Sequence, residues 1–338
     1  MTNFPRTRSS WVGKFTVALG LSTMVLTSSI AQPNAWPFKP IKLVVCFPPG
    51  NAADMLARSI GPILSERLGQ PVVVENRAGA GGVVGVDAVA KATNDGHTIG
   101  VCSLSPITII PAIRKQMPYD VNKDIAPVIL SNHGPMVLVV KKNSPFNTLS
   151  DLIQYAKANP NKLSYGSLGP GTISQMSTEA FKMASGIQIT EISYKGSGQA
   201  LTDLVGGHVD VMLDGAASAV AQVAAGTVKA LAVTTQKRST LLPEVPTMHE
   251  TNLAGLKGFD FFGWVGVIAP AGTSSETLNR LNKEIAFALK NPQVIQRVNA
   301  AGQDIYDANT PDQFREFIKG DAARWASVAR KLNLELKD

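Results

Sequence analysis

The chain has 338 residues, of which 44% are hydrophobic and 17% charged. This composition is ordinary for a folded globular protein and excludes wholesale disorder, and the length is enough for two lobes. The net charge is +7, of which +3 comes from residues 1–31, so the remainder carries a mild +4. These charges are spread along the chain without a basic stripe, which argues against nucleic-acid binding and suits small anionic molecules.

Residues 1–31 are predicted to be a cleavable signal peptide. Three basic residues and no acidic one precede an apolar run from Phe15 to Ile30, and small residues occupy both positions that a signal peptidase reads. A membrane anchor is the weaker alternative, because the run is short and interrupted by hydroxyl residues. We expect cleavage after Ala31, with Ala35 as the second choice, and an exported protein located in the periplasm.

Strands and helices alternate in the next hundred residues. Apolar, β-branched runs predict strands, and apolar residues at helical spacing predict helices. We expect strands over 41–45, 72–76 and 97–102, a helix that starts at Asn51 or Ala52, and a second helix over 83–92. Such alternation predicts a parallel sheet covered by helices.

A second alternating block follows. Strands are predicted over 125–130 and 136–140, separated by a loop at 131–135, and then over 163–166, 189–193, 209–213, 228–234 and 261–268. Helices are expected over 149–158, 173–184, 198–205 and 273–290, and from Thr310, where a capping box with proline at the first helical position begins. The predicted fold is α/β with two lobes joined by crossing strands: 32–137 with 266–338, and 138–265.

Two strand–helix connections are candidate anion sites. Pro48, Pro49 and Gly50 end the first strand, and the helix that follows presents unpaired backbone N–H groups and the positive end of its dipole. The stretch Ser167–Thr172 has the same form in the second lobe. Facing each other across a cleft, the two could hold both carboxylates of a diacid, or one carboxylate and a polar tail. Since every α/β protein has such connections, spacing alone leaves this interpretation and the ordinary structural one about equal.

Three further positions have competing interpretations. In the loop at 194–198, the backbone N–H groups of Gly196 and Ser197 are better ligand donors than the side chain of Lys195. Asp214 could bind a ligand or a water, but capping a helix that starts near Ala216 is slightly favoured. With Asn51 as N-cap, Asp54 is at the third helical position, where its carboxylate is expected to cap the helix.

The chain offers little catalytic chemistry. The stretch Arg77–Gly85 fails as a dinucleotide fingerprint, because its third glycine position is Val84. Gly166–Gly169 lacks the Gly-x-Ser-x-Gly spacing of a nucleophile elbow, and the four histidines show no metal-ligand spacing. We therefore predict no catalytic residue, no cofactor and no metal.

The only cysteines, Cys46 and Cys102, both end predicted strands in the same lobe. An oxidising compartment would permit a disulfide between them. Two unpaired buried residues are the favoured interpretation, because bridges between neighbouring parallel strands are geometrically awkward.

From Pro37 almost to its end, the chain resembles the periplasmic solute-binding proteins of tripartite tricarboxylate transporters, also called Bordetella uptake (Bug) receptors. The resemblance rests on a set of motifs in a specific order, at 39–45, 47–50, 54–58, 68–77, 79–82, 118–120, 194–196, 230–234 and 242–247. It implies a two-lobed, type II-like Venus-flytrap fold that closes on an organic acid. One departure is Asn51, where the family usually has a second glycine. Cys46 and Cys102 also replace the usual neighbours of the pocket.

The resemblance also implies which groups touch the ligand. In the family, backbone and hydroxyl groups of the first strand–helix loop and of loops in the second lobe hold the carboxylate. On this chain the ligand-binding residues would be Phe47, Gly50, Asn51, Ala52, Ser103, Ser105, Ser167, Gly171, Thr172, Gly196, Ser197 and Asp214. Because Asn51 adds an amide donor and acceptor, an aromatic or longer dicarboxylate is the expected ligand.

The sequence thus predicts a monomeric exported receptor that binds an organic carboxylate, either a di- or tricarboxylate or an aromatic dicarboxylate, and delivers it to membrane permease subunits of a tripartite transporter. Two alternatives stay open. One is a secreted α/β enzyme, a hydrolase or dehydrogenase acting on an organic acid. The other is a receptor that reports ligand occupancy to a two-component sensor.

Overall fold

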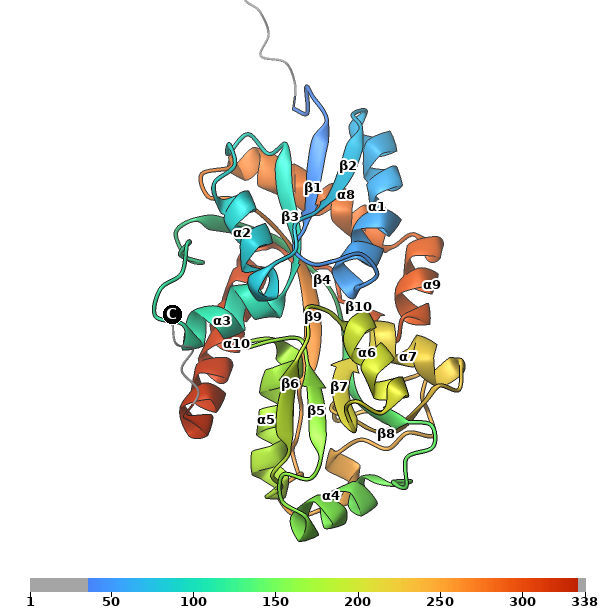
Figure 1. The fold of residues 1–338 in the computed structure, drawn as a ribbon. Helices are drawn as coiled ribbons and strands as arrows, with labels where there is room; N and C mark the ends of the chain where they lie inside the picture. Colours follow the sequence, from blue (N-terminus) through green and yellow to red (C-terminus); the bar gives the residue numbers. More distant parts are fainter. Residues whose placement is uncertain (1–35, 334–338) are drawn as a thin grey trace, which may run out of the picture. The chain divides into compact units, whose positions relative to one another are not determined.

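The computed structural model describes residues 36–333 (Figure 1). The predicted signal peptide and both cleavage positions lie outside these residues. Within the described part of the chain, no helix is long and apolar enough to cross a membrane.

Lobe 1 is built on the predicted parallel strands, which lie in the upper half of Figure 1. Strand β1 (Ile41–Val45) pairs in parallel with β2 (Val72–Asn76) and β3 (Thr98–Ser103). Strand β9 (Phe262–Pro270) is antiparallel to β3. The lobe's helices are α1 (Ala52–Leu68), α2 (Val83–Ala90), α3 (Ile110–Ile113), α8 (Ser275–Leu289), α9 (Pro292–Ala300) and α10 (Pro311–Leu332). Helix α9 and the short strand β10 (Asp304–Ile305) were not predicted.

Lobe 2 repeats this design. Strand β5 (Ser164–Ser167) is parallel to both β6 (Thr190–Ser193) and β7 (Val211–Gly215). Strand β8 (Val228–Val233) pairs in antiparallel fashion with β4 (Ile125–Lys141). The helices are α4 (Leu149–Ala158), α5 (Ile173–Ser185), α6 (Ser197–Gly206) and α7 (Ala216–Ala224).

One long strand, β4 (Ile125–Lys141), crosses between the lobes. The predicted loop at 131–135 is therefore wrong. Its turn-forming residues are held extended by neighbouring strands, because His133 to Pro135 pair with β9 and Asn132 and His133 pair with β10. From Met136 onward, β4 pairs instead with β7 and β8. A single strand thus belongs to the sheets of both lobes.

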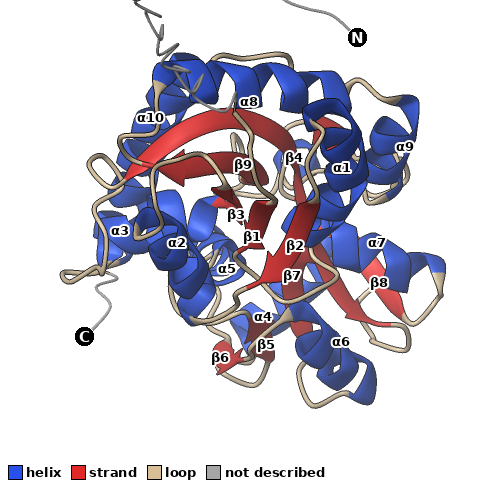
Figure 2. Ribbon diagram, turned by 90° about the horizontal axis from the view of Figure 1, so that it is seen from above, coloured by secondary structure: helices blue, strands red, loops and turns tan. Residues whose placement is uncertain are grey.

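Buried apolar clusters cover both faces of each sheet. In lobe 1, one cluster joins α1, α8 and α9 to the strands, and a second joins α2, α3 and α10 to the other face. Lobe 2 has two corresponding clusters, one with α4 and α5 and one with α6 and α7. Figure 2 shows the helices around the central strands. Each lobe is a helix–sheet–helix sandwich, which confirms the predicted α/β class.

The two cysteines are paired, contrary to the favoured prediction. Cys46 and Cys102 form a disulfide with their Cα atoms 5.2 Å apart, inside the range that a bridge spans. Since Val45 is opposite Val101 in the parallel register of β1 and β3, the cysteines that follow are also adjacent. Gly85 of α2 leaves room for them, because a Cβ there would lie 2.8 Å from the Cys46 sulfur.

Candidate functional site

A cavity of about 120 Å³ lies between the lobes. This is several times the volume of about 10–15 Å³ that a cavity must offer a single water, so a small organic molecule fits. Lobe 1 contributes the loops that follow β1 and β3, lobe 2 contributes the starts of α5 and α7, and β4 and β9 pass behind. The lining residues are Phe47, Asn51, Ala52, Ala53, Ser103, Leu104, Ser105, Met136, Leu168, Thr172, Ile173, Gly215, Ala217, Ser218, Gly263, Trp264, Val265 and Gln303.

None of these lining residues has an ionisable side chain. The polar groups are instead hydroxyls and amides, and the first turns of α1, α5 and α7 all contribute lining residues. First-turn N–H groups have no partner inside their own helix, and each helix start carries a partial positive charge. The cavity therefore attracts an anion without containing a fixed cation.

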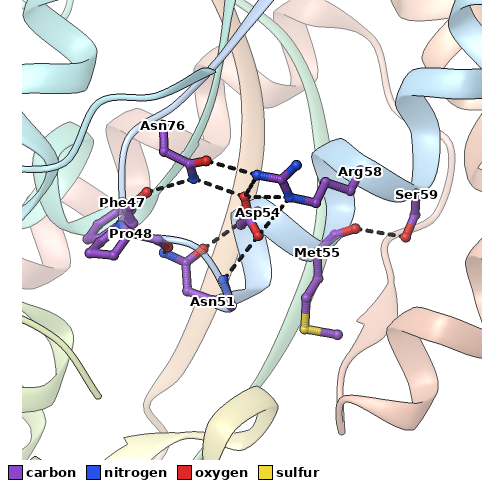
Figure 3. A network of polar contacts seen from close by, with 9 residues as sticks. Phe47, Pro48, Asn51, Asp54, Met55, Arg58, Ser59 and Asn76 are labelled. Carbon is purple, nitrogen blue, oxygen red and sulfur yellow. Dashed lines mark hydrogen bonds and ion pairs between the residues drawn. The ribbon is translucent and has the colours of Figure 1, made fainter. Parts of the chain in front are cut away.

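The start of α1 is fixed by a dense polar network (Figure 3). Asn51 is the N-cap, and its Oδ1 accepts from the Asp54 N–H at 3.0 Å. Asp54 in turn accepts from the Gly50 N–H at 3.0 Å, from Asn76 at 2.9 Å and from Arg58 at 3.0 Å. This confirms Asp54 as a capping residue. Gly50 has φ +91°, a conformation that favours glycine, and lets the chain turn into the helix.

The electrostatics of Asp54 favour its ionised form. Burial of the carboxylate opposes ionisation, but hydrogen bonds from Arg58, Asn76 and the Gly50 N–H, together with the Arg58 charge, lower its pKa from 3.8. Asn76 also donates to the Phe47 carbonyl at 3.0 Å, so the network positions the loop that lines the cavity.

Replacing Asp54 by asparagine is expected to lower the free energy of unfolding by about 2 kcal/mol at pH 7, since charge-assisted hydrogen bonds are lost. A carboxylate whose pKa is lowered on folding stabilises the protein above its unfolded pKa of about 3.9, and this contribution is lost as pH falls through the folded pKa. Urea denaturation of both proteins at pH 7 and pH 3 measures this. The difference should shrink at pH 3, and equal stability at pH 7 would contradict the assignment.

The start of α5 is built around Thr172. Its Oγ1 accepts from the Gln175 N–H at 3.4 Å and donates to the Gly169 carbonyl at 2.7 Å. The next N–H, that of Ile173, donates to the Ser105 hydroxyl of lobe 1 at 3.1 Å. The two lobes therefore meet directly at the cavity wall.

The start of α7 has a different construction. The N-cap residue is Gly215, which has no side chain to accept a hydrogen bond. The backbone N–H groups in the first turn of α7 therefore need acceptors from elsewhere. Asp214 directly precedes Gly215 in β7 and is 1% exposed, accepting from the Ser197 hydroxyl at 2.8 Å and from the Ser218 hydroxyl. Burial raises the pKa of Asp214, and the bonds from Ser218, Ser197 and Gly215 oppose this rise. Asp214 thus orients two hydroxyls, of which Ser218 lines the cavity.

Gln303 is a lining residue that sequence reasoning missed. It precedes β10, and its Oε1 accepts from Asn132 on β4. Among residues 36–333 its Nε2 has no hydrogen-bond partner, which makes this amide a candidate donor to a ligand in the cavity. Residues near 303 show no local motif, and only the pairing of β10 with β4 brings Gln303 to the site.

Six of the twelve predicted ligand residues line the cavity: Phe47, Asn51, Ala52, Ser103, Ser105 and Thr172. The other six lie just outside it, in the same loops or bonded to them. Gly50 donates to Asp54, Ser167 donates to Glu191 at 2.5 Å, and Gly171 donates to Gln175 at 2.8 Å. Ser197 donates to Asp214, and a Cβ on Gly196 would lie 3.9 Å from Pro48 of lobe 1.

Comparison with known proteins places this geometry in a family. Residues 56–334 match the model of the tripartite tricarboxylate transporter family receptor. Protein BugT of Bordetella pertussis (strain Tohama I) is 37% identical over 321 residues, which cover 94% of this chain and 97% of that protein. The solved structure of R. palustris Rpa4515 with adipate is 34% identical with a TM-score of 0.84, covering 89% of this chain and 99% of that one.

MatC from Rhodopseudomonas palustris with bound malate is 32% identical, with a TM-score of 0.80, and the match covers 87% of this chain and 99% of that one. These likenesses confirm the resemblance seen in the motifs and the two-lobed fold. The family consists of substrate-binding receptors, which removes the enzyme alternative. The chain belongs to the tripartite tricarboxylate transporter receptor family and is a periplasmic solute-binding receptor.

Proposed function

We propose that this receptor captures an organic carboxylate in the cavity between its lobes and delivers it to the membrane subunits of a tripartite tricarboxylate-type transporter. The observation that carries the proposal is a cavity into which three helix starts project without an ionisable side chain. Each helix dipole stabilises a nearby anion by about 0.3–1 kcal/mol when exposed, and by up to about 2 kcal/mol when partly buried. Hydroxyl and amide groups complete the donor set.

The lining also restricts the ligand class. Phe47, Leu104, Met136, Ile173 and Trp264 form apolar walls, which suit an apolar ligand body. Because the lining contains no carboxylate, the ammonium group of an amino acid would be buried without a counter-ion, which is costly. We therefore assign the ligand as an aromatic or longer aliphatic dicarboxylate. Adipate, with which the related Rpa4515 was solved, is a member of the aliphatic class.

The predicted site residues divide into those that would touch the ligand and those that would support them. The residues that would touch the ligand are Phe47, Asn51, Ala52, Ser103, Ser105 and Thr172. The residues that would hold these loops in place are Gly50, Ser167, Gly171, Gly196, Ser197 and Asp214.

The two lobes would close by a hinge in the crossing strands. Lobe 1 comprises 32–137 with 266–338, and lobe 2 comprises 138–265. Support for this hinge comes from β4, whose partners change from β9 and β10 to β7 and β8 near Met136. Export through cleavage after Ala31 completes the proposal.

A thermal-shift panel tests this proposal. The panel contains aliphatic dicarboxylates, citrate-like tricarboxylates, aromatic dicarboxylates and amino acids, with nicotinamide cofactors added as a control. A ligand at 100 times its Kd stabilises the folded protein by about 2.7 kcal/mol, which raises Tm by several degrees. We expect selective shifts with apolar dicarboxylates and none with amino acids. A shift with a cofactor and with no carboxylate would overturn the proposal.

A further inference from the structure

We infer that the disulfide between Cys46 and Cys102 is a positioning element of the binding site, which fixes the Phe47 loop relative to the rest of the cavity wall. Each cysteine directly precedes a lining residue, Phe47 in one case and Ser103 in the other. The inference rests on the proposed function, because it concerns the same cavity. It assigns the two cysteines a role in ligand affinity in addition to stability.

The bridge lies where β1 stops pairing with β3. The Cys46 N–H donates to the Val101 carbonyl at 3.3 Å, just beyond the register pair Val45 and Val101. On the β3 side the chain remains anchored, because Ser103 still pairs with Val265 of β9. On the β1 side the chain leaves the sheet and enters the Phe47 loop. The disulfide therefore ties a departing loop to a strand end that β9 holds in place.

Noncovalent contacts also hold the Phe47 loop. The Phe47 side chain packs against the buried cluster that includes Cys46, Cys102 and Leu104, and side-chain hydrogen bonds fix the backbone of the loop. Asn76 holds the Phe47 carbonyl, and Asp54 holds the Gly50 N–H. Both bonds originate on the α1 and β2 side of the loop. The disulfide is the covalent tie toward β3, so its loss leaves the loop held on that side by the Cys46 N–H hydrogen bond and by packing alone.

The surroundings of the sulfur atoms are shaped for the bridge. Both cysteines are fully buried, and α2 approaches closely at Gly85, where a Cβ would lie 2.6 Å from the Cys46 Cα. A Cβ on Gly100 would lie 3.2 Å from the Cys102 sulfur. Because these two glycines have no side chain, the backbone packs tightly around the bridge. Tight packing transmits a displacement of one group to its neighbours.

Reduction would change this arrangement in a defined way. A dithiol reductant supplies two electrons and two protons, breaks the S–S bond and leaves two thiols, while the reductant itself becomes a disulfide. Two thiol sulfurs cannot remain at the covalent distance of about 2 Å, so they must separate. With α2 packed over Cys46, the displacement falls on the Phe47 loop.

The test compares the oxidised protein with the Cys46→Ala/Cys102→Ala variant. Thiol titration of the denatured wild type is expected to find no free thiol. Hydrogen–deuterium exchange without ligand is expected to be at least about tenfold faster in the variant at 47–51, where Phe47, Gly50 and Asn51 carry the exchanging amides, and unchanged at 149–158 in lobe 2. The Kd for adipate, measured by calorimetry, is expected to rise at least about tenfold. A reductant should change neither quantity in the variant.

Val44→Ala is the matched control, because Val44 is buried in β1 but has no covalent tie to β3. It should lower Tm and leave the exchange at 47–51 and the adipate Kd unchanged. The inference is overturned if the two variants give the same exchange at 47–51, or if the wild type contains two free thiols. Failure of the oxidised wild type to bind adipate would count against the proposed ligand class, while the exchange experiment would still decide the role of the bridge.

Discussion

Thr172→Leu is expected to weaken carboxylate binding by more than 100-fold, equivalent to about 3 kcal/mol, while the protein stays folded. Thr172 lines the cavity, caps α5 and is 3% exposed, so leucine would remove the hydroxyl and place a larger apolar side chain in the ligand's space. Loss of the cap alone costs about 1 kcal/mol of stability. Calorimetry with the best carboxylate of the panel measures the effect on binding.

Thr148→Leu is the control for the loss of a helix cap. Thr148 caps α4 in the same lobe, with its Oγ1 accepting from the Asp151 N–H at 3.1 Å, but it does not line the cavity. This variant should lose a similar amount of stability and bind ligand normally. Equal affinity of Thr172→Leu and wild type would remove the start of α5 from the binding site.

The second large effect is expected from Gln303→Glu, which adds a negative charge to the cavity with almost no change of shape. At pH 7 the affinity for a dicarboxylate should fall more than 100-fold, because two like charges would be buried close together. Burial raises the pKa of such a glutamate, so affinity should recover as pH falls toward 5 and the side chain becomes neutral. Calorimetry at several pH values measures this recovery.

Gln303→Met separates charge from the loss of donors. Methionine keeps the length of the side chain but supplies no N–H group, so a fall of about tenfold is expected, equivalent to the loss of a hydrogen bond. This fall should not depend on pH. If Gln303→Glu binds the dicarboxylate as tightly as the wild type at pH 7, no carboxylate lies near residue 303.

Local chemistry explains what could be predicted from the sequence. The start of α1 is recognisable because proline, glycine and asparagine encode the end of a strand and an N-cap within a few residues. Asp54 is identifiable as a capping residue for the same reason. Most helices and strands follow from short apolar patterns, which persist in the fold because each lobe buries them on its own sheet.

Long-range pairing explains what the sequence did not reveal. Ser131 to Pro135 have turn propensities, but pairing with β9 keeps them extended, so two predicted strands are one. Gln303 reaches the cavity only through the pairing of β10 with β4. The disulfide depends on the register of two strands 56 residues apart along the chain, which no local pattern encodes.

Sequence reasoning also selected Asp214 at a position where the neighbouring Ser218 lines the cavity. Asp214 is a candidate ligand residue from the sequence, yet its carboxylate is buried and bonded to two serines, and Ser218 is the group on the cavity wall. Periodicity places a helix near residue 216, but it does not say which residue of the first turn faces the ligand. Which residue faces the ligand depends on the orientation of α7 relative to β7 at the cavity.

A crystal structure of the protein with the tightest-binding carboxylate of the panel tests the central claim most directly. We expect the carboxylate oxygens within hydrogen-bond distance, about 2.7–3.2 Å, of first-turn N–H groups or hydroxyls of α1, α5 or α7. No lysine or arginine should lie within about 4 Å of the ligand, a distance at which an ion pair would form. A carboxylate paired with a basic side chain, or a ligand bound outside this cavity, would contradict the account.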